Sequence, residues 1–223
     1  MPENVLVVAV HPDDETLGCG GTLLRHKKEG DNTSWLIVTS MKEEQGYSRK
    51  QIAARQKQIE QVAQHYSFSE VLNLDIPAGR VDDMSTADLV EMCAQVITKA
   101  QPTVLYLPFM FDVHSDHRST FHAIYSATKW FRHPSIQRIY LMETQSETDF
   151  AIGTHGQVFV PNYFVDISNC LKDKIKIAAL YESEFKDHPF PRSSRNIEAL
   201  ASVRGATSGF EYAEAFQLIK ERR

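Results

Sequence analysis

Apolar and polar positions follow two different periods along the first two thirds of the chain. Short runs that are almost wholly apolar predict buried strands at residues 5–10, 35–39, 71–74, 104–107 and 136–142. Between them, apolar residues recur every three or four positions, which predicts helices at residues 15–28, 49–65, 86–100 and 114–131. This alternation predicts an α/β fold that is Rossmann-like, with a mostly parallel sheet and helices on both faces.

The last third of the chain follows these periods less regularly. We expect a strand at residues 163–167 and helices at 170–184 and 196–206, whereas residues 211–223 fit either a helix or a strand. No repeat, low-complexity stretch or linker interrupts the sequence. Because 223 residues suit one α/β domain, we expect residues 1–223 to form a single domain.

Composition and charge exclude several classes of protein. The formal net charge is −5 and no long basic run occurs, which argues against a nucleic-acid partner. Cys19, Cys93 and Cys170 lack metal-site or disulfide spacing, which fits a reducing compartment. The chain has no signal-peptide pattern and no apolar run of about 18 residues. We therefore expect a cytoplasmic protein without a membrane span. The sequence is compatible with a homo-oligomer.

Candidate chemistry begins where the first strand ends, at His11-Pro12-Asp13-Asp14-Glu15. Burying an imidazole and several carboxylates beside a hydrophobic core costs free energy unless they are hydrogen-bonded or bind a metal ion. Histidine nitrogen and aspartate oxygen are ordinary zinc ligands. We expect His11 and Asp14 to bind one divalent ion, with Asp13 beside it as a base for water. The alternative is that the acids cap the next helix and His11 is a satisfied polar residue.

A second polar cluster, His114-Ser115-Asp116-His117, follows the fourth strand. One of its histidines can complete a set of two histidines and one carboxylate, which leaves positions open for water and substrate. The other histidine can stabilise an oxyanion and donate a proton, with Asp112 or Asp116 raising its pKa through a hydrogen bond. Two such clusters, each after a predicted strand, favour a metal hydrolase over helix capping.

A dinucleotide site is the main competing interpretation of the first strand, turn and helix. Gly18, Gly20 and Gly21 do not give the GxGxxG pattern, and they follow acids that would repel a pyrophosphate. We expect instead that these small residues let the helix pack close to the sheet.

Both polar clusters resemble motifs of a known family. Residues 9–15 resemble the (A)HPDDE motif of the LmbE-like, PIG-L family of zinc-dependent N-deacetylases, and residues 114–117 resemble its later HxDH motif. Residues 204–216 are similar to the closing segment of that family. The resemblance implies a Rossmann-like fold, one catalytic zinc, and removal of an acetyl group from an N-acetylated amino sugar of the N-acetylglucosamine type, or from its conjugate.

The resemblance also implies roles for individual residues. His11, Asp14 and His117 resemble the metal ligands, and Zn²⁺ is expected, with Fe²⁺ or a similar divalent ion as the alternative. Asp13 resembles the general base, His114 the electrophilic and acid histidine, and Asp116 the residue that orients it. Ser115 stands where the family usually has proline, and residues 43–46 replace a frequent Gly-Glu pair.

Three arginines are candidates for substrate contacts. Arg55 resembles in location an arginine that contacts sugar hydroxyls or a charged aglycone in relatives, and a solvated helix face is the alternative. Arg80 and Arg192 could meet an anionic group, or form surface salt bridges instead. His155 or His188 could reach the mouth of the site. A hydrolase of another amide or ester, and a metal-binding partner subunit without turnover, remain alternative functions.

Overall fold

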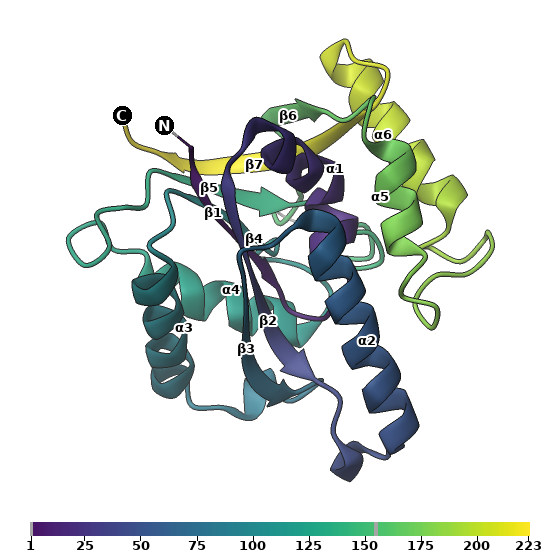
Figure 1. Ribbon diagram of the computed structural model, residues 1–223. Helices are drawn as coiled ribbons and strands as arrows, with labels where there is room; N and C mark the ends of the chain where they lie inside the picture. Colours follow the sequence, from purple (N-terminus) through teal and green to yellow (C-terminus); the bar gives the residue numbers. More distant parts are fainter. Residues whose placement is uncertain (1, 154–155) are drawn as a thin grey trace.

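A computed structural model describes residues 2–153 and 156–223. Their centre is a seven-stranded sheet in the order β3-β2-β1-β4-β5-β7-β6 (Figure 1). The strands are β1 (Asn4–Ala9), β2 (Asn32–Ser40), β3 (Glu70–Pro77), β4 (Val104–Leu107), β5 (Arg138–Met142), β6 (Tyr163–Asp166) and β7 (Ala213–Glu221). The first five are parallel, whereas β7 runs antiparallel to both β5 and β6. The predicted α/β fold with a mostly parallel sheet is confirmed.

Helices cover both faces of this sheet (Figure 1). They are α1 (Asp14–Glu29), α2 (Arg49–Tyr66), α3 (Thr86–Ala100), α4 (Ser115–Ala127), α5 (Leu171–Ala178) and α6 (Ser194–Ser208), with short 3₁₀ turns η1 (Glu43–Gln45) and η2 (Val81–Asp83). Strand β1 shows the two-sided burial: Leu6 packs in the cluster that contains residues of α3 and α4, and Val7 packs with residues of α1 and α2. Burial on both faces explains why the parallel strands are continuous apolar runs.

The order of the strands reverses beside β1, and this reversal positions the site. The chain moves outward from β1 to β2 and β3, then returns to the other side of β1 as β4. The loops after β1 and β4 therefore diverge and leave a crevice at the carboxyl edge of the sheet. The two polar clusters of the sequence occupy these loops, because α1 begins at Asp14 and α4 at Ser115.

Glycines in α1 permit close packing, as expected. A Cβ atom on Gly18 would lie 2.9 Å from Cβ of Met142 in β5, and one on Gly21 would lie 2.6 Å from Cγ2 of Ile167. Both distances are shorter than real Cβ contacts. The small residues thus bring the helix that starts at the site against the sheet and the loop after β6.

The structure decides one assignment that the sequence left open and shortens two expected helices. The unassigned segment 211–223 contains strand β7, which inserts between β5 and β6. The helix expected at 170–184 ends at Ala178, so residues 179–193 form a loop over the site instead. Similarly, α4 ends at Ala127 rather than continuing to residue 131.

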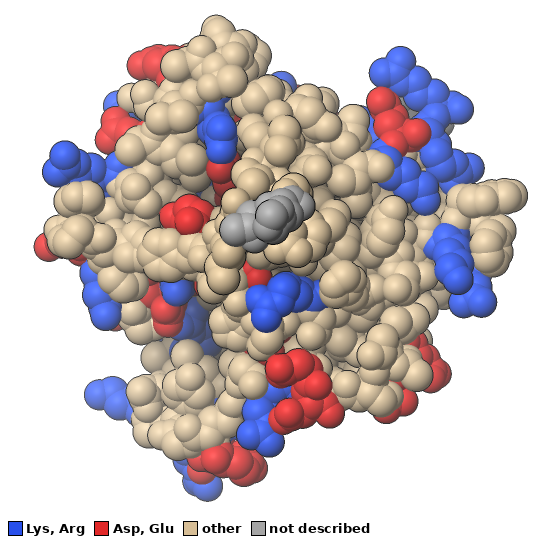
Figure 2. All heavy atoms as spheres, turned by 180° about the vertical axis from the view of Figure 1, so that it is seen from behind, with Lys and Arg blue, Asp and Glu red and all other residues tan. Residues whose placement is uncertain are grey.

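Surface charge is dispersed on the face opposite to that of Figure 1. Figure 2 shows Lys and Arg side chains in small groups, interspersed with Asp and Glu, with wide uncharged areas between them. Over the described residues of this face, no continuous basic band is visible. None of the helices within residues 2–153 and 156–223 has the length and apolar character needed to span a bilayer.

Candidate metal centre and active site

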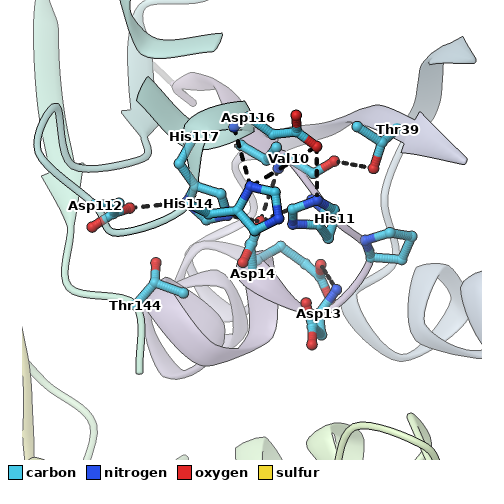
Figure 3. A network of polar contacts seen from close by, with 12 residues as sticks. Val10, His11, Asp13, Asp14, Thr39, Asp112, His114, Asp116, His117 and Thr144 are labelled. Carbon is cyan, nitrogen blue, oxygen red and sulfur yellow. Dashed lines mark hydrogen bonds and ion pairs between the residues drawn. The ribbon is translucent and has the colours of Figure 1, made fainter. Parts of the chain in front are cut away.

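The two polar clusters meet at the carboxyl edge of the sheet. One potential ligand atom each from His11, Asp14 and His117 lie within 4.8 Å of one another. Nε2 of His117 lies 3.3 Å from Oδ2 of Asp14, and both side chains are buried. Figure 3 shows the three side chains converging from the loop after β1, the start of α1 and the first turn of α4. The predicted ligand trio is therefore assembled in space.

The backbone between β1 and α1 is folded back on itself to make this geometry. The amides of Val10 and His11 both donate to Oδ2 of Asp14 at 2.9 Å, which ties the first residue of α1 to the end of β1. Asp13, between them, has φ 150° and ψ −25°, a conformation that costs a non-glycine residue about 1–3 kcal/mol. Asp13 stands at the N-cap position but its side chain makes no capping hydrogen bond. The helix-capping alternative is thus wrong for Asp13.

The environment of His117 fits a metal ligand. Nδ1 of His117 lies 2.9 Å from Oδ2 of Asp112, which fixes the ring and assigns the hydrogen to Nδ1. Nε2 is buried and has no hydrogen-bond partner among the described residues. Burial would lower the pKa of His117, but the charge of Asp14 and the hydrogen bond to Asp112 raise it well above its ordinary value. Positive charge is therefore favoured at this point, as a divalent cation would provide.

Asp116 interacts with a different histidine from the expected one. Its Oδ2 lies 3.2 Å from Nε2 of His11, whereas its closest approach to Nδ1 of His114 is 4.0 Å. The Asp116 carboxylate also accepts hydrogen bonds from the amides of Gly79 and Val81 at 2.6 and 3.0 Å. The expectation that the Asp116 side chain orients His114 is thus corrected: the carboxylate contacts His11, and it is the backbone amide of Asp116 that contacts His114.

His114 is held in a neutral form. Burial and the neighbouring His11 lower the pKa of His114, and they outweigh the charge of Asp116, which raises it as expected. Nδ1 of His114 accepts the amide hydrogen of Asp116 at 3.1 Å, so the neutral tautomer carries its hydrogen on Nε2. His114 can therefore donate a hydrogen bond to a developing oxyanion without first being protonated.

Asp13 has the properties of a base that works near neutral pH. The residue is 5% exposed, and its Oδ2 accepts a hydrogen bond from Nη1 of Arg192 at 2.7 Å. Burial and the charge of Asp14 raise the pKa of Asp13 to about 6, against the opposing effect of Arg192. A buried carboxylate beside the ligand trio, but outside it, is suited to accept a proton from water.

A cavity of about 410 Å³ opens above these residues. His11, Asp13, Asp14 and His114 line one end of it. The remaining polar lining consists of seven uncharged side chains, from Thr39, Ser40, Tyr47, Gln56, Asn73, Gln145 and Ser146, and four charged ones, from Arg55, Glu147, Glu184 and Arg192. Such a space is large enough for a small ligand and rich in partners for hydroxyl groups.

The three candidate arginines differ in position. Arg80 does not line the cavity; it is exposed and pairs with Asp83, so the salt-bridge alternative describes it. Arg55 is only 8% exposed, so a solvated helix face is wrong for it. Nη1 of Arg55 donates to the carbonyl of Pro12 at 2.8 Å, and Nη2 donates to Glu184 at 2.9 Å. Arg192 bridges Asp13 and Glu184.

Several cavity residues were not found from the sequence. Glu184 and the loop residues Gln145 and Glu147 line the cavity, although no motif contains them. Gln145 and Glu147 could have been predicted from their place directly after β5, because all parallel strands of the sheet end at the same edge, where the site lies. His188 is exposed and does not line the cavity, and His155 lies outside the described residues.

Comparison with known proteins identifies the family. Residues 6–128, more than half of the chain, match the PIG-L family, described as GlcNAc-PI de-N-acetylase, and the chain belongs to this family. It is 23% identical over 224 residues to a diacetylchitobiose deacetylase of Thermococcus kodakarensis, covering 97% of this chain and 83% of the relative.

Solved structures share the fold over nearly the whole chain. The conserved protein TT1542 from Thermus thermophilus is 26% identical, with a TM-score of 0.78 and coverage of 99% of this chain and 96% of the other. GalB, the 4-carboxy-2-hydroxymuconate hydratase from Pseudomonas putida, is 18% identical, with a TM-score of 0.74 and coverage of 100% and 98%. The fold alone therefore does not define the reaction.

Proposed function

We propose that this protein is a zinc-dependent hydrolase that removes the N-acetyl group from an N-acetylated amino sugar of the N-acetylglucosamine type, or its conjugate, and releases acetate. The observation that supports this most is the position of Asp13, a buried carboxylate beside the trio of His11, Asp14 and His117 but not part of it. Membership of the PIG-L family and the similarity to a diacetylchitobiose deacetylase support the sugar amide as substrate. We assign the whole of residues 1–223 to one catalytic domain.

In this proposal, His11, Asp14 and His117 hold the divalent ion. Two histidines and one carboxylate fit Zn²⁺ with positions left open, and Fe²⁺ is the alternative that the same donors would accept. When bound, such an ion supplies a Lewis acid for a carbonyl oxygen and lowers the pKa of water. Through its hydrogen bond to Nδ1, Asp112 orients the His117 ring and leaves Nε2 without a hydrogen, as a nitrogen that would bind the ion requires.

The chain's own residues then perform the proton transfers. Asp13 accepts a proton from the attacking water, while Arg192 holds its Oδ2 in place. His114 donates a hydrogen bond from Nε2 to the acetamide oxygen as negative charge develops there. The proton taken by Asp13 is close to the scissile bond and is available for the sugar nitrogen when acetate leaves. Metal binding alone requires neither Asp13 nor His114, which counts against a non-catalytic partner subunit.

A substrate panel tests the proposal directly. Acetate release is measured with zinc-loaded protein on N-acetylglucosamine, N,N′-diacetylchitobiose and further N-acetylhexosamine conjugates, with and without a chelator. The proposal predicts that at least one of them releases acetate and amino sugar in equal amounts, and that the chelator abolishes the reaction. Hydrolysis of simple esters or other amides, with every N-acetyl sugar left intact, would contradict it.

A further inference from the structure

The loop after β5 carries a buried donor atom and a buried acceptor atom without hydrogen-bond partners in the portion of the chain that the structure describes, on two residues that line the cavity. Gln145 and Glu147 both line it. Nε2 of Gln145 and Oε2 of Glu147 are buried, and neither has a hydrogen-bond partner within the described parts of the chain. Gln145 is only 3% exposed. Buried polar atoms without partners are rare in native proteins, and those that line a cavity are candidates for contacts to a ligand.

The loop that carries this pair is fixed to the metal-binding end of the molecule. The hydroxyl of Thr148 donates to Oδ1 of Asp112 at 2.7 Å, and Asp112 in turn contacts His117. The amide of Val113 donates to the carbonyl of Glu147 at 3.1 Å. Gln145 and Glu147 are thus held at a defined place relative to the ligand trio, as a preorganised subsite requires.

The charges around the cavity disfavour an anionic substrate. Arg55 and Arg192 are the only Lys or Arg side chains among its described lining residues, and both are already engaged. Arg55 pairs with Glu184, and Arg192 pairs with Glu184 and Asp13. A phosphate or carboxylate on the substrate would therefore meet no free cation among these lining residues. Burial raises the pKa of Glu147 to about 7, so the repulsion of an anion by this carboxylate grows as pH rises above 7.

We propose that Gln145 and Glu147 bind one hydroxyl group of the sugar, so that the cavity selects an uncharged N-acetyl sugar over a phosphorylated or carboxylated one. A hydroxyl is both donor and acceptor; it would donate to Oε2 of Glu147 and accept from Nε2 of Gln145, satisfying both atoms. This inference rests on the proposed function and narrows its substrate class. It replaces the expectation of an anionic group at Arg80 and Arg192.

The test is a double-mutant cycle in which one change is made in the protein and the other in the ligand, and the binding affinity of each combination is measured. The probe is the methanesulfonamide analogue of N-acetylglucosamine, which resists hydrolysis, together with its monodeoxy forms at C3, C4 and C6 and its 6-phosphate. Binding to zinc-loaded protein is measured by NMR titration for the parent, Glu147→Leu, Gln145→Leu and Glu147→Gln. Glu182→Gln is the matched control, because Glu182 is an exposed carboxylate outside the cavity lining.

One deoxy form should bind about tenfold more weakly than the full probe to the parent and to Glu182→Gln. In Glu147→Leu and in Gln145→Leu, this deoxy form and the full probe should bind with equal affinity. The 6-phosphate should bind the parent at least about tenfold more weakly than the neutral probe, and Glu147→Gln should reduce this difference if Glu147→Leu fails to fold.

The inference is overturned if every deoxy form binds the parent equally well, if the deoxy penalty persists in both leucine variants, or if the 6-phosphate binds more tightly than the neutral probe. Absence of binding by any probe also overturns it. Acetate release is assayed separately on N-acetylglucosamine, so the proposed hydrolysis can stand while this subsite is rejected.

Discussion

At the scale of single residues, the site combines strain, burial and charge around Asp13. Its φ of 150° is maintained because Oε2 of Glu15 accepts its amide hydrogen at 3.1 Å, and the flanking Asp14 is tied to β1. Tyr181 donates to the other oxygen of Glu15 at 2.8 Å. A strained carboxylate held by buried neighbours and by Arg192 is typical of a catalytic group.

Replacing Asp13 by Asn should separate metal binding from turnover. Because Asp13 lies outside the ligand trio, the variant should retain one zinc per chain on elemental analysis and lose about 10²-fold or more of kcat for acetate release. Asp82→Asn, at an exposed carboxylate in η2, serves as the control and should keep the parent rate. A parental kcat in Asp13→Asn would refute the assignment of the base.

Removal of the hydrogen bond between Asp112 and His117 should lower the affinity of the protein for zinc. Asp112→Asn should weaken zinc binding by about 10- to 100-fold, since the orientation and basicity of the imidazole depend on this carboxylate. His117→Ala should lose the ion altogether. Competition with a chromophoric chelator measures both constants, and equal zinc affinity in the parent and His117→Ala would exclude His117 as a ligand.

Glu15 should make the metal-free protein less stable as pH rises. Burial raises the pKa of Glu15 from 4.5 to about 8, so between these values the folded state holds a proton that the unfolded state has released. This contribution to the free energy of unfolding is fully present below pH 4.5 and is lost as pH rises through 8. Urea unfolding at several pH values should show a steeper decline for the parent than for Glu15→Gln. Identical slopes would contradict the prediction.

At the scale of elements, α1 links the site to the C-terminal segment. The helix is interrupted at Cys19, whose φ is −148°, and the amides of Gly21 and Thr22 that follow donate to the carboxylate of Glu214. Lys174 from α5 donates to the same carboxylate at 2.7 Å, and all of these groups are buried. Strand β7 therefore fixes the helix whose first residue is the proposed ligand Asp14.

Gly21→Ala should destabilise the protein through this packing. The added Cβ would lie 2.6 Å from Cγ2 of Ile167, and overpacking of this kind costs about 1–3 kcal/mol. Gly153→Ala is the matched control, because its Cβ would meet nothing closer than 3.4 Å. Denaturant midpoints should fall for Gly21→Ala alone and recover in part when Ile167 is also replaced by Ala. An unchanged midpoint in Gly21→Ala would contradict the packing argument.

Sequence patterns predicted the elements, and the two short motifs together with the family resemblance gave the proposed ligand trio, because both depend on residues close together in the sequence. Apolar runs mark buried strands, and the loops after β1 and β4 carry His11, Asp14 and His117 within short motifs. The partners of those residues come from elsewhere. Asp116 is held by amides of residues 79 and 81, and Arg192 reaches Asp13 from a loop that follows the shortened helix α5. Such contacts depend on tertiary packing, and no local pattern encodes them.

At the scale of the whole molecule, the fold provides a crevice and the loops provide the chemistry. A hydratase shares this fold with a TM-score of 0.74, so strand order alone does not separate hydrolysis from addition of water. The features here that support hydrolysis are three potential metal ligands gathered at one end of a cavity and a buried carboxylate, Asp13, beside them. The proposed function therefore requires that two loops, far apart in the sequence, contribute ligands to the same ion.

Anomalous diffraction at the zinc edge, from crystals of the zinc-loaded protein, tests this claim most directly. The account predicts one strong peak within about 2.0–2.2 Å of a nitrogen of His11, an oxygen of Asp14 and Nε2 of His117. Asp13 should approach the ion without coordinating it. A peak at another cluster, such as His26 with Asp31, or no peak at the crevice, would contradict the account.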